Sequence, residues 1–240
     1  MAGHSRWAKV KNFKGAIDAK RGKIFSKLAK EITIAARLAG GDPDMNPRLR
    51  MALLKCRGAN MPNDNIDRAI KRGTGAGEMI TYEDLTYELY GPNGVAMLVE
   101  LSTDNRNRTA AEIRSVMTKN GGSIATAGAV SRLFQRKGQL IVPREAANED
   151  QLMEIVLEAG AEDFRVEAEG YEILTEPGRF ETVHRAVEAK GIKCAVAEVT
   201  YLPTITVPLD AEAARPVHRL IEALEDHDDV KEVYANVEFT

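Results

Sequence analysis

The sequence predicts an α+β protein of three domains, and three observations lead to this fold class. Three helical patterns precede a glycine-rich joint at residues 73–77, and the residues after that joint read as strands separated by turns. From residue 139 onward, strands and helices alternate in the order β-α-β-β-α-β. With 240 residues, 44% of them hydrophobic, the chain is long enough to bury more than one core.

Three helices are predicted in the N-terminal domain, residues 1–77. Over Lys20–Leu38, apolar residues fall on one arc of a helix and basic residues on the opposite arc. A second helix is expected over Asn46–Gly58, because asparagine is a favourable N-cap and proline follows it. The third helix is expected over Asp64–Arg72 and to stop at Gly73, with cations in its last turns.

The rest of the chain is predicted to form two ferredoxin-like (split βαβ) α/β domains, with the third domain inserted in the second. Residues 138–203 contain the complete β-α-β-β-α-β order. Residues 204–240 hold only a strand, a helix and a strand, which is too little for a domain. We therefore expect them to complete the domain that residues 78–137 begin.

Some boundaries within these domains follow from local signals. Thr103 or Asp104 can cap a helix that ends at the glycines of positions 121 and 122. Separate strands are expected around 130–135 and over Leu140–Val142, and one strand is expected over Val230–Val237.

Charge is divided unevenly along the chain. The first 77 residues contain 17 Lys and Arg against 6 Asp and Glu, whereas the remaining 163 contain 16 against 30. Surface charge has little influence on which fold forms, so this division indicates a polyanionic partner for the N-terminal domain. Nucleic acid is the partner that we expect.

The candidate nucleic-acid-binding residues lie before the first helix, on its basic arc and at the end of the third helix. They are Arg6, Lys9, Lys11, Lys14, Lys20, Arg21, Lys23, Lys27, Lys30, Arg68, Lys71 and Arg72. The alternatives are a solvated helix face and, for the last three, interaction with the helix dipole. Binding to a membrane surface is less favoured, because a helical bundle would use the apolar arc.

Two smaller sets of residues have open roles. Trp7 and Phe13 lie among the basic residues and could stack on unpaired bases or pack against the helices. Arg106 and Arg108 lie near a helix N-terminus, where cations are unfavourable. Contact with RNA, DNA or a neighbouring domain explains them as well as an interdomain salt bridge does.

No motif predicts catalysis, a cofactor, a metal site or a small-molecule substrate. The four histidines and two cysteines lack zinc-binding spacing, and residues 73–77 lack the Lys-Ser/Thr pair of a phosphate-binding loop. No apolar run is long enough to span a membrane. The N-terminus lacks the apolar stretch of a secretory signal, a mitochondrial transit peptide is less favoured, and Cys56 and Cys194 are expected to be reduced. We expect a cytoplasmic protein.

Several long motifs along the whole chain resemble the YebC/PmpR family. They are AGHSRW at 2–7, DAKRGKIF at 18–25, GDP at 41–43, NPRLR at 46–50, NMP at 60–62, IDRAIKRGTG at 66–75, YELYGP at 87–92 and TDNRNRT at 103–109. Arg6 stands where many relatives have lysine, and this change keeps the charge.

The resemblance implies a cytoplasmic, non-enzymatic protein of three domains that is labelled as a transcriptional regulator. Some members bind promoter DNA, and the mitochondrial relatives are translational activators of cytochrome oxidase. Bacterial members have been tied to ribosomes stalled on proline-rich sequences.

We therefore expect a nucleic-acid-binding regulator of gene expression, first of all a DNA-binding transcriptional regulator that uses its basic helical domain. The alternative is a translation factor associated with the ribosome or ribosomal RNA. The predicted helices over 46–58 and 64–72 are short and show no row of Asn, Gln and Arg suited to base edges in a major groove. This favours recognition of nucleic-acid shape. An enzyme with a site between domains is a distant third class.

Overall fold

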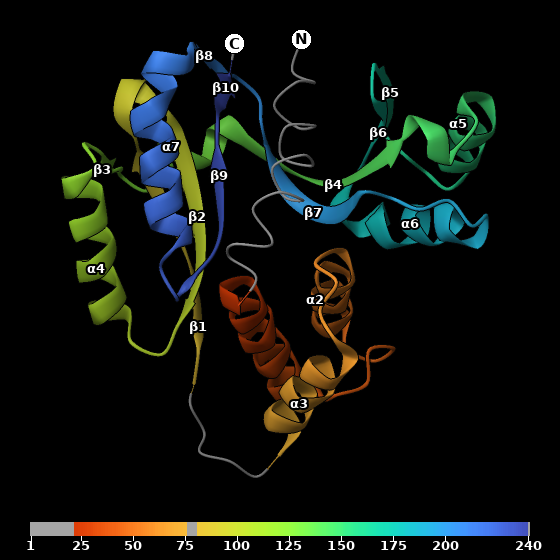
Figure 1. The fold of residues 1–240 in the computed structure, drawn as a ribbon, viewed down its shortest axis with the longest axis horizontal. Coiled ribbons are helices and arrows are strands. Elements are labelled where there is room, and N and C mark those ends of the chain that lie inside the picture. Colours follow the sequence, from red (N-terminus) through yellow and green to blue (C-terminus); the bar gives the residue numbers. More distant parts are fainter. Residues whose placement is uncertain (1–21, 76–80, 240) are drawn as a thin grey trace. The chain divides into compact units, whose positions relative to one another are not determined.

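The α+β class is confirmed by a computed structural model, which describes residues 22–75 and 81–239 (Figure 1). A helical N-terminal region is followed by two four-stranded sheets with their helices. By their contacts, the described residues form two compact units. The first joins the helices before residue 76 to residues 136–200, and the second joins residues 81–135 to residues 201–239. The finer division of the first unit into two domains stays a prediction.

Three helices make up the N-terminal part of the first unit. The first covers residues 22–39, and α2 (Pro47–Gly58) and α3 (Asn63–Thr74) follow it. They share a core of buried residues, which are Ile32, Ala35, Leu49, Ala52, Cys56, Met61 and Ala69. The prediction that the third helix stops at Gly73 is wrong, because this glycine is buried within α3.

Asn46 explains why α2 begins where the sequence predicts. Its side-chain oxygen accepts the N–H of Leu49 at 3.0 Å, which caps the helix. Its amide nitrogen donates to the carbonyls of Ala35 at 2.8 Å and Gly40 at 2.7 Å. One buried side chain therefore satisfies backbone groups at the end of the first helix and at the beginning of α2.

The sheet of the first unit has the split-βαβ plan. Its strands lie in the order β5-β6-β4-β7. Along the chain, the elements are β4 (Phe134–Pro143), α5 (Glu149–Glu158), β5 (Asp163–Glu167), β6 (Gly170–Thr175), α6 (Phe180–Ala189) and β7 (Val196–Pro203). Apolar residues of the sheet and of both helices form one core around Leu140, Leu152 and Phe180.

The second unit also contains a four-stranded sheet with two helices, but its chain connections differ. The sheet order is β3-β1-β2-β9, and a short turn with a left-handed Asn93 joins β1 to β2. Both helices lie on the same face of the sheet (Figure 1) and share its main core. The elements are β1 (Glu83–Tyr90), β2 (Ala96–Thr103), α4 (Arg106–Lys119), β3 (Ser123–Ile124), β8 (Val207–Leu209), α7 (Ala211–Glu225), β9 (Val230–Ala235) and β10 (Val237–Phe239).

Several predicted boundaries need correction. The two strands expected around 130–135 and 140–142 are one continuous strand, β4, which a short 3-10 turn at Ser131–Leu133 precedes. The strand expected over Val230–Val237 is interrupted at Asn236, whose side chain accepts the N–H of Ala96 at 2.8 Å. The cap of α4 is Asn105 instead of Thr103 or Asp104. These differences depend on partners that are distant in sequence or on the choice among adjacent capping residues.

Among the described residues, none of the helices is long and apolar enough to cross a membrane.

Candidate nucleic-acid interface

The first helix and α3 approach each other closely at Gly73. A Cβ atom at this position would lie 2.5 Å from the backbone oxygen of Thr33 and 2.7 Å from the Cβ of Ala36. The hydroxyl of Thr33 also lies 3.2 Å from the carbonyl oxygen of Ala69, to which it can donate. Glycine at position 73 therefore allows the two helices to pack with their backbones almost in contact.

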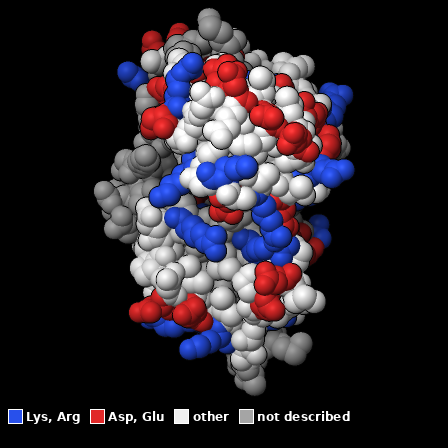
Figure 2. Space-filling model, turned by 90° about the vertical axis from the view of Figure 1, so that its right-hand side faces the viewer, with Lys and Arg blue, Asp and Glu red and all other residues white. Residues whose placement is uncertain are grey.

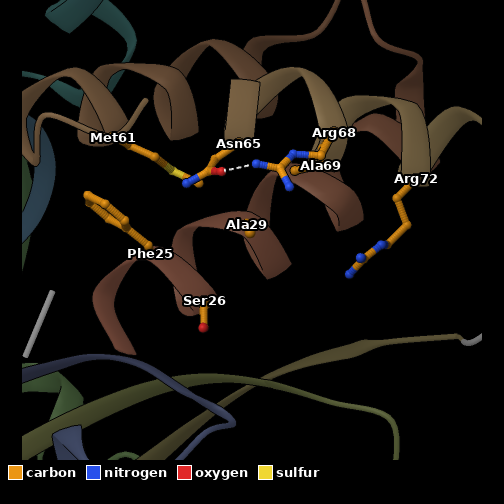
Figure 3. Close-up of a pocket in the computed structure, with 8 residues that line it drawn as sticks. All are labelled: Phe25, Ser26, Ala29, Met61, Asn65, Arg68, Ala69 and Arg72. Atoms are coloured by element: carbon orange, nitrogen blue, oxygen red, sulfur yellow. Dashed lines mark hydrogen bonds between the residues drawn. The ribbon is translucent and has the colours of Figure 1, made fainter. Parts of the chain in front are cut away.

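A hollow of about 230 Å³ lies between these helices (Figure 3). The first helix contributes Phe25, Ser26 and Ala29 to its lining. The other lining residues precede or belong to α3, and they are Met61, Asn65, Arg68, Ala69 and Arg72. Figure 3 shows the Phe25 ring and Met61 at one end of the hollow and the Arg72 guanidinium at the other. The lining is thus apolar at one end and cationic at the other.

The cations of α3 differ in their partners. Arg68 donates to the backbone oxygen of Asp64 at 3.0 Å and to the side-chain oxygen of Asn65. Lys71 and Arg72 are exposed, and within the described chain their side chains have no hydrogen bond or ion pair. The structure therefore brings two of the predicted residues, Arg68 and Arg72, to one hollow and leaves Lys71 beside it on the same helix.

The lysines on the predicted basic arc of the first helix are less exposed to solvent than expected. Lys23, Lys27 and Lys30 are half-buried, and each has an interaction within the chain. None of the three is therefore a free ammonium group. The remaining candidates lie outside the described residues, and they are Arg6, Trp7, Lys9, Lys11, Phe13, Lys14, Lys20 and Arg21.

Three of the four basic residues of α2 are paired within the first unit. Arg48 forms a two-point pair with Glu31, with its Nε 2.8 Å from Oε1. Arg50 pairs with Glu181 at 2.8 Å, and the Lys55 ammonium lies 3.9 Å from Glu198. The face drawn in Figure 2 has Asp and Glu side chains between and beside its Lys and Arg side chains. Most of the positive charges of α2 are therefore paired with carboxylates of the same unit.

Arg106 and Arg108 both have acidic partners within the second unit. The Nη2 of Arg108 lies 2.9 Å from Asp229 and 2.9 Å from Asp104, and these hydrogen bonds raise the pKa of the arginine. Arg106 lies 3.4 Å from Glu83. These ion pairs connect elements of one unit. The sequence had suggested either contact with nucleic acid or a neighbouring domain, or a salt bridge between domains, and neither alternative describes ion pairs within one unit.

Asp229 belongs to the one group in the described chain with enough clustered oxygen and nitrogen atoms for a metal, together with Glu112 and His227. The backbone N–H of Asp229 donates to Nδ1 of His227 at 3.1 Å, so Nε2 carries the proton and donates to Glu112 at 2.9 Å. Asp229 already accepts from Arg108 and from the Thr109 hydroxyl. The atoms that could bind a metal therefore already form hydrogen bonds within the protein, and we interpret the group as a structural hydrogen-bond network.

The two cysteines are unsuited to nucleophilic chemistry. Burial raises the pKa of the Cys56 thiol to about 11 and that of Cys194 to about 12. Both therefore stay protonated at neutral pH, and a thiol is a much weaker nucleophile than a thiolate.

Sequence reasoning did not single out Phe25, Met61 or Asn65 as site residues. Phe25 and Ala29 lie four residues apart and so share one stripe of the first helix, a signal that was available. That α3 covers this stripe depends on packing between residues about 40 positions apart. The sequence pattern contained no sign of that contact.

Comparisons with known proteins agree on one family. Residues 5–76 match the TACO1/YebC protein N-terminal domain, and residues 82–237 match the TACO1/YebC second and third domain. A protein from Rubrobacter xylanophilus is 52% identical over 100% of this chain and 96% of its own length. One from Acidobacterium capsulatum is 54% identical over 98% of this chain and 96% of its own. Both are named "probable transcriptional regulatory protein".

The fold also matches a solved structure. A crystal structure of a conserved hypothetical protein from Aquifex aeolicus is 45% identical, with a TM-score of 0.79 over 93% of each chain. Sequence similarity over the full length and both domain matches show that the chain belongs to the TACO1/YebC family.

Proposed function

We propose that this protein is a cytoplasmic regulator of gene expression that binds nucleic acid through its N-terminal helical domain. One observation carries the proposal: Lys71 and Arg72 are exposed at the end of α3 and have no partner in the described chain. Arg68 lies one turn away, so three cations share one short stretch of helix. Lys and Arg that contact phosphates release counterions, which favours binding.

The first candidate is a DNA-binding transcriptional regulator. The names of the relatives support it, since they are called transcriptional regulatory proteins. In this case the cations of α3 would hold the phosphate backbone of a promoter, and contacts elsewhere would read its sequence.

The second candidate is an RNA-binding factor in translation, and the environment of α2 and α3 favours it. Arg48, Arg50 and Lys55 of α2 are engaged in ion pairs. The exposed face of α3 includes two acids, Asp64 and Asp67, which repel phosphates at its N-terminal end. Neither helix therefore offers a long cationic face that could lie in a major groove.

A charge-reversal series tests the shared proposal. We expect R68E/K71E/R72E to weaken binding strongly and to reduce the slope of log affinity against log salt by about 2 to 3, because about three phosphate contacts are lost. The matched control reverses three exposed cations of the second unit, R114E/R215E/R219E. It makes the same change in net charge and should leave most of the affinity and its salt slope.

Equal losses in the two variants would contradict the assignment to the helical domain. Thermal unfolding of both variants separates loss of binding from loss of the fold, because cations near a helix C-terminus also stabilise the helix. Crosslinking in cells, followed by sequencing of the bound nucleic acid, distinguishes the two candidates. Discrete promoter fragments would support the first, and recovery dominated by ribosomal RNA would support the second.

A further inference from the structure

We propose that the hollow between the first helix and α3 binds one unpaired base of RNA. Phe25 would stack on the base, Asn65 would contact its edge, and Arg72 would hold the neighbouring phosphate. This inference rests on the second candidate function and adds to it a specific type of ligand, a nucleotide that lies outside a duplex.

The order of side chains along the hollow fits one nucleotide. Phe25 is half-buried at one end, so its ring is held by the helical core while part of it borders the hollow. Arg72 lies at the other end and is exposed (Figure 3). A nucleotide also has a flat apolar part and an anionic part. Aromatic rings stack on bases of every type, and Arg forms two-point contacts with phosphate.

Asn65 lies between these two ends and has a free donor. Its side-chain oxygen accepts a hydrogen bond from Arg68, which fixes the orientation of the amide. Within the described chain, its side-chain nitrogen has no acceptor. The amide could therefore donate to an oxygen or nitrogen atom on the edge of a base.

The size of the hollow limits what it can hold. Its volume is about 230 Å³, whereas sites for drug-sized molecules and cofactors range from about 300 to 1,000 Å³. A dinucleotide cofactor would not fit, but a single ring system would. RNA regularly presents such single bases in loops and bulges, where they are splayed out and can stack on aromatic side chains.

The test compares two RNA hairpins that differ by one bulged nucleotide in the stem. Dissociation constants of the full-length protein for both are measured by fluorescence anisotropy at one salt concentration. We expect the wild type to bind the bulged hairpin about tenfold more tightly, within the range for stacking one base on an aromatic ring. A DNA hairpin with the same bulge shows whether RNA is required, and equal or tighter binding of that DNA would overturn the assignment to RNA.

Three variants then locate the preference. F25L keeps an apolar side chain for the helical core but removes the aromatic plane, so the preference for the bulge should fall to about one. N65A should reduce it by a smaller factor. R72Q should reduce both the affinity and the preference, because its charge borders the hollow.

K71Q is the matched control, since it removes one cation from the adjacent position of α3 outside the hollow. It should weaken binding of both hairpins by the same factor and leave the preference unchanged. Unfolding temperatures of all four variants are measured. If F25L unfolds at a much lower temperature than the wild type, F25M replaces it.

Each result is decisive. If the wild type binds both hairpins equally, the proposed function stands and the base-binding hollow is wrong. If F25L retains the tenfold preference, the base lies elsewhere. If the protein binds neither hairpin, the RNA-binding candidate itself fails, and this inference fails with it.

Discussion

The carboxylate of Glu88 in β1 accepts three backbone N–H groups from one loop of the second unit. Its oxygens lie 2.7 Å from the nitrogen of Gly128, 2.6 Å from that of Val130 and 2.9 Å from that of Ser131. Burial raises the pKa of Glu88, but the hydrogen bonds from this loop together outweigh it, and the pKa lies below its ordinary value. The charged form of one residue therefore holds the loop to the sheet.

We expect E88Q to lower the free energy of unfolding by about 1 kcal/mol at pH 7, since the amide keeps only one acceptor oxygen and no charge. The folded pKa of Glu88 is depressed, so its carboxylate stabilises the fold above the unfolded pKa of about 4.3. That contribution is lost as the pH falls through the folded pKa. Urea unfolding at pH 7 and at pH 3 should therefore show a difference that shrinks in acid.

The matched control for this residue is E154Q, which changes an exposed glutamate of α5 without a hydrogen bond or ion pair in the described chain. It should leave stability unchanged at both pH values. A loss in E88Q that is equally large at pH 3 would show that packing of the side chain, and not its charge, holds the loop.

Among secondary-structure elements, the contact of the first helix with α3 depends on Gly73. We expect G73A to lower the free energy of unfolding by about 1 to 2 kcal/mol. Alanine is the better helix former by about 1 kcal/mol, but overpacking of a tight contact costs up to about 3 kcal/mol. The contact atom nearest to the new methyl group is backbone, the carbonyl oxygen of Thr33, so the helices themselves must move apart.

G58A provides the comparison, because Gly58 is exposed at the end of α2 and nothing lies within 4 Å of a Cβ there. This variant should be neutral or slightly stabilising. Thermal unfolding of both proteins measures the difference, and equal stability of G73A and the wild type would contradict the close helix packing.

The same elements show which features the sequence could predict. The beginning of α2 follows from a local signal, the N-cap Asn46 with Pro47 after it. Gly73 looked like a helix end because glycine commonly follows the last turn of a helix. Its actual role depends on Thr33, 40 residues earlier in the chain, and a local pattern contains no information about that contact.

For the molecule as a whole, the division of charge predicted a nucleic-acid partner, but it could not separate engaged cations from available ones. Arg48 and Arg50 contribute to the positive charge of the first 77 residues, and both are bound to acids of the same unit. Among the predicted binding residues, Lys23, Lys27 and Lys30 likewise have interactions within the chain. Within the described residues, the site that we propose consists of the hollow and the end of α3.

Hydrogen exchange over the whole chain tests this location. When an RNA hairpin with a bulged nucleotide is added, we expect slower exchange in residues 22–39 and in α3. We expect no change in α4 or α7, whose cations lie in the acidic part of the chain. The reason is that bound nucleic acid restricts opening of the helices it contacts, while helices of the other unit keep their own opening free energies.

The R68E/K71E/R72E protein is the control, and its exchange should not respond to the RNA at concentrations that saturate the wild type. Protection centred on α4 would move the interface to the second unit and would assign Arg106 and Arg108 a role in binding beyond their ion pairs. Protection confined to residues 22–39 and α3 would instead show that a chain with a net charge of −3 binds a polyanion through a minor part of its surface. In that case salt should weaken binding through only a few phosphate contacts, which gives a shallow slope.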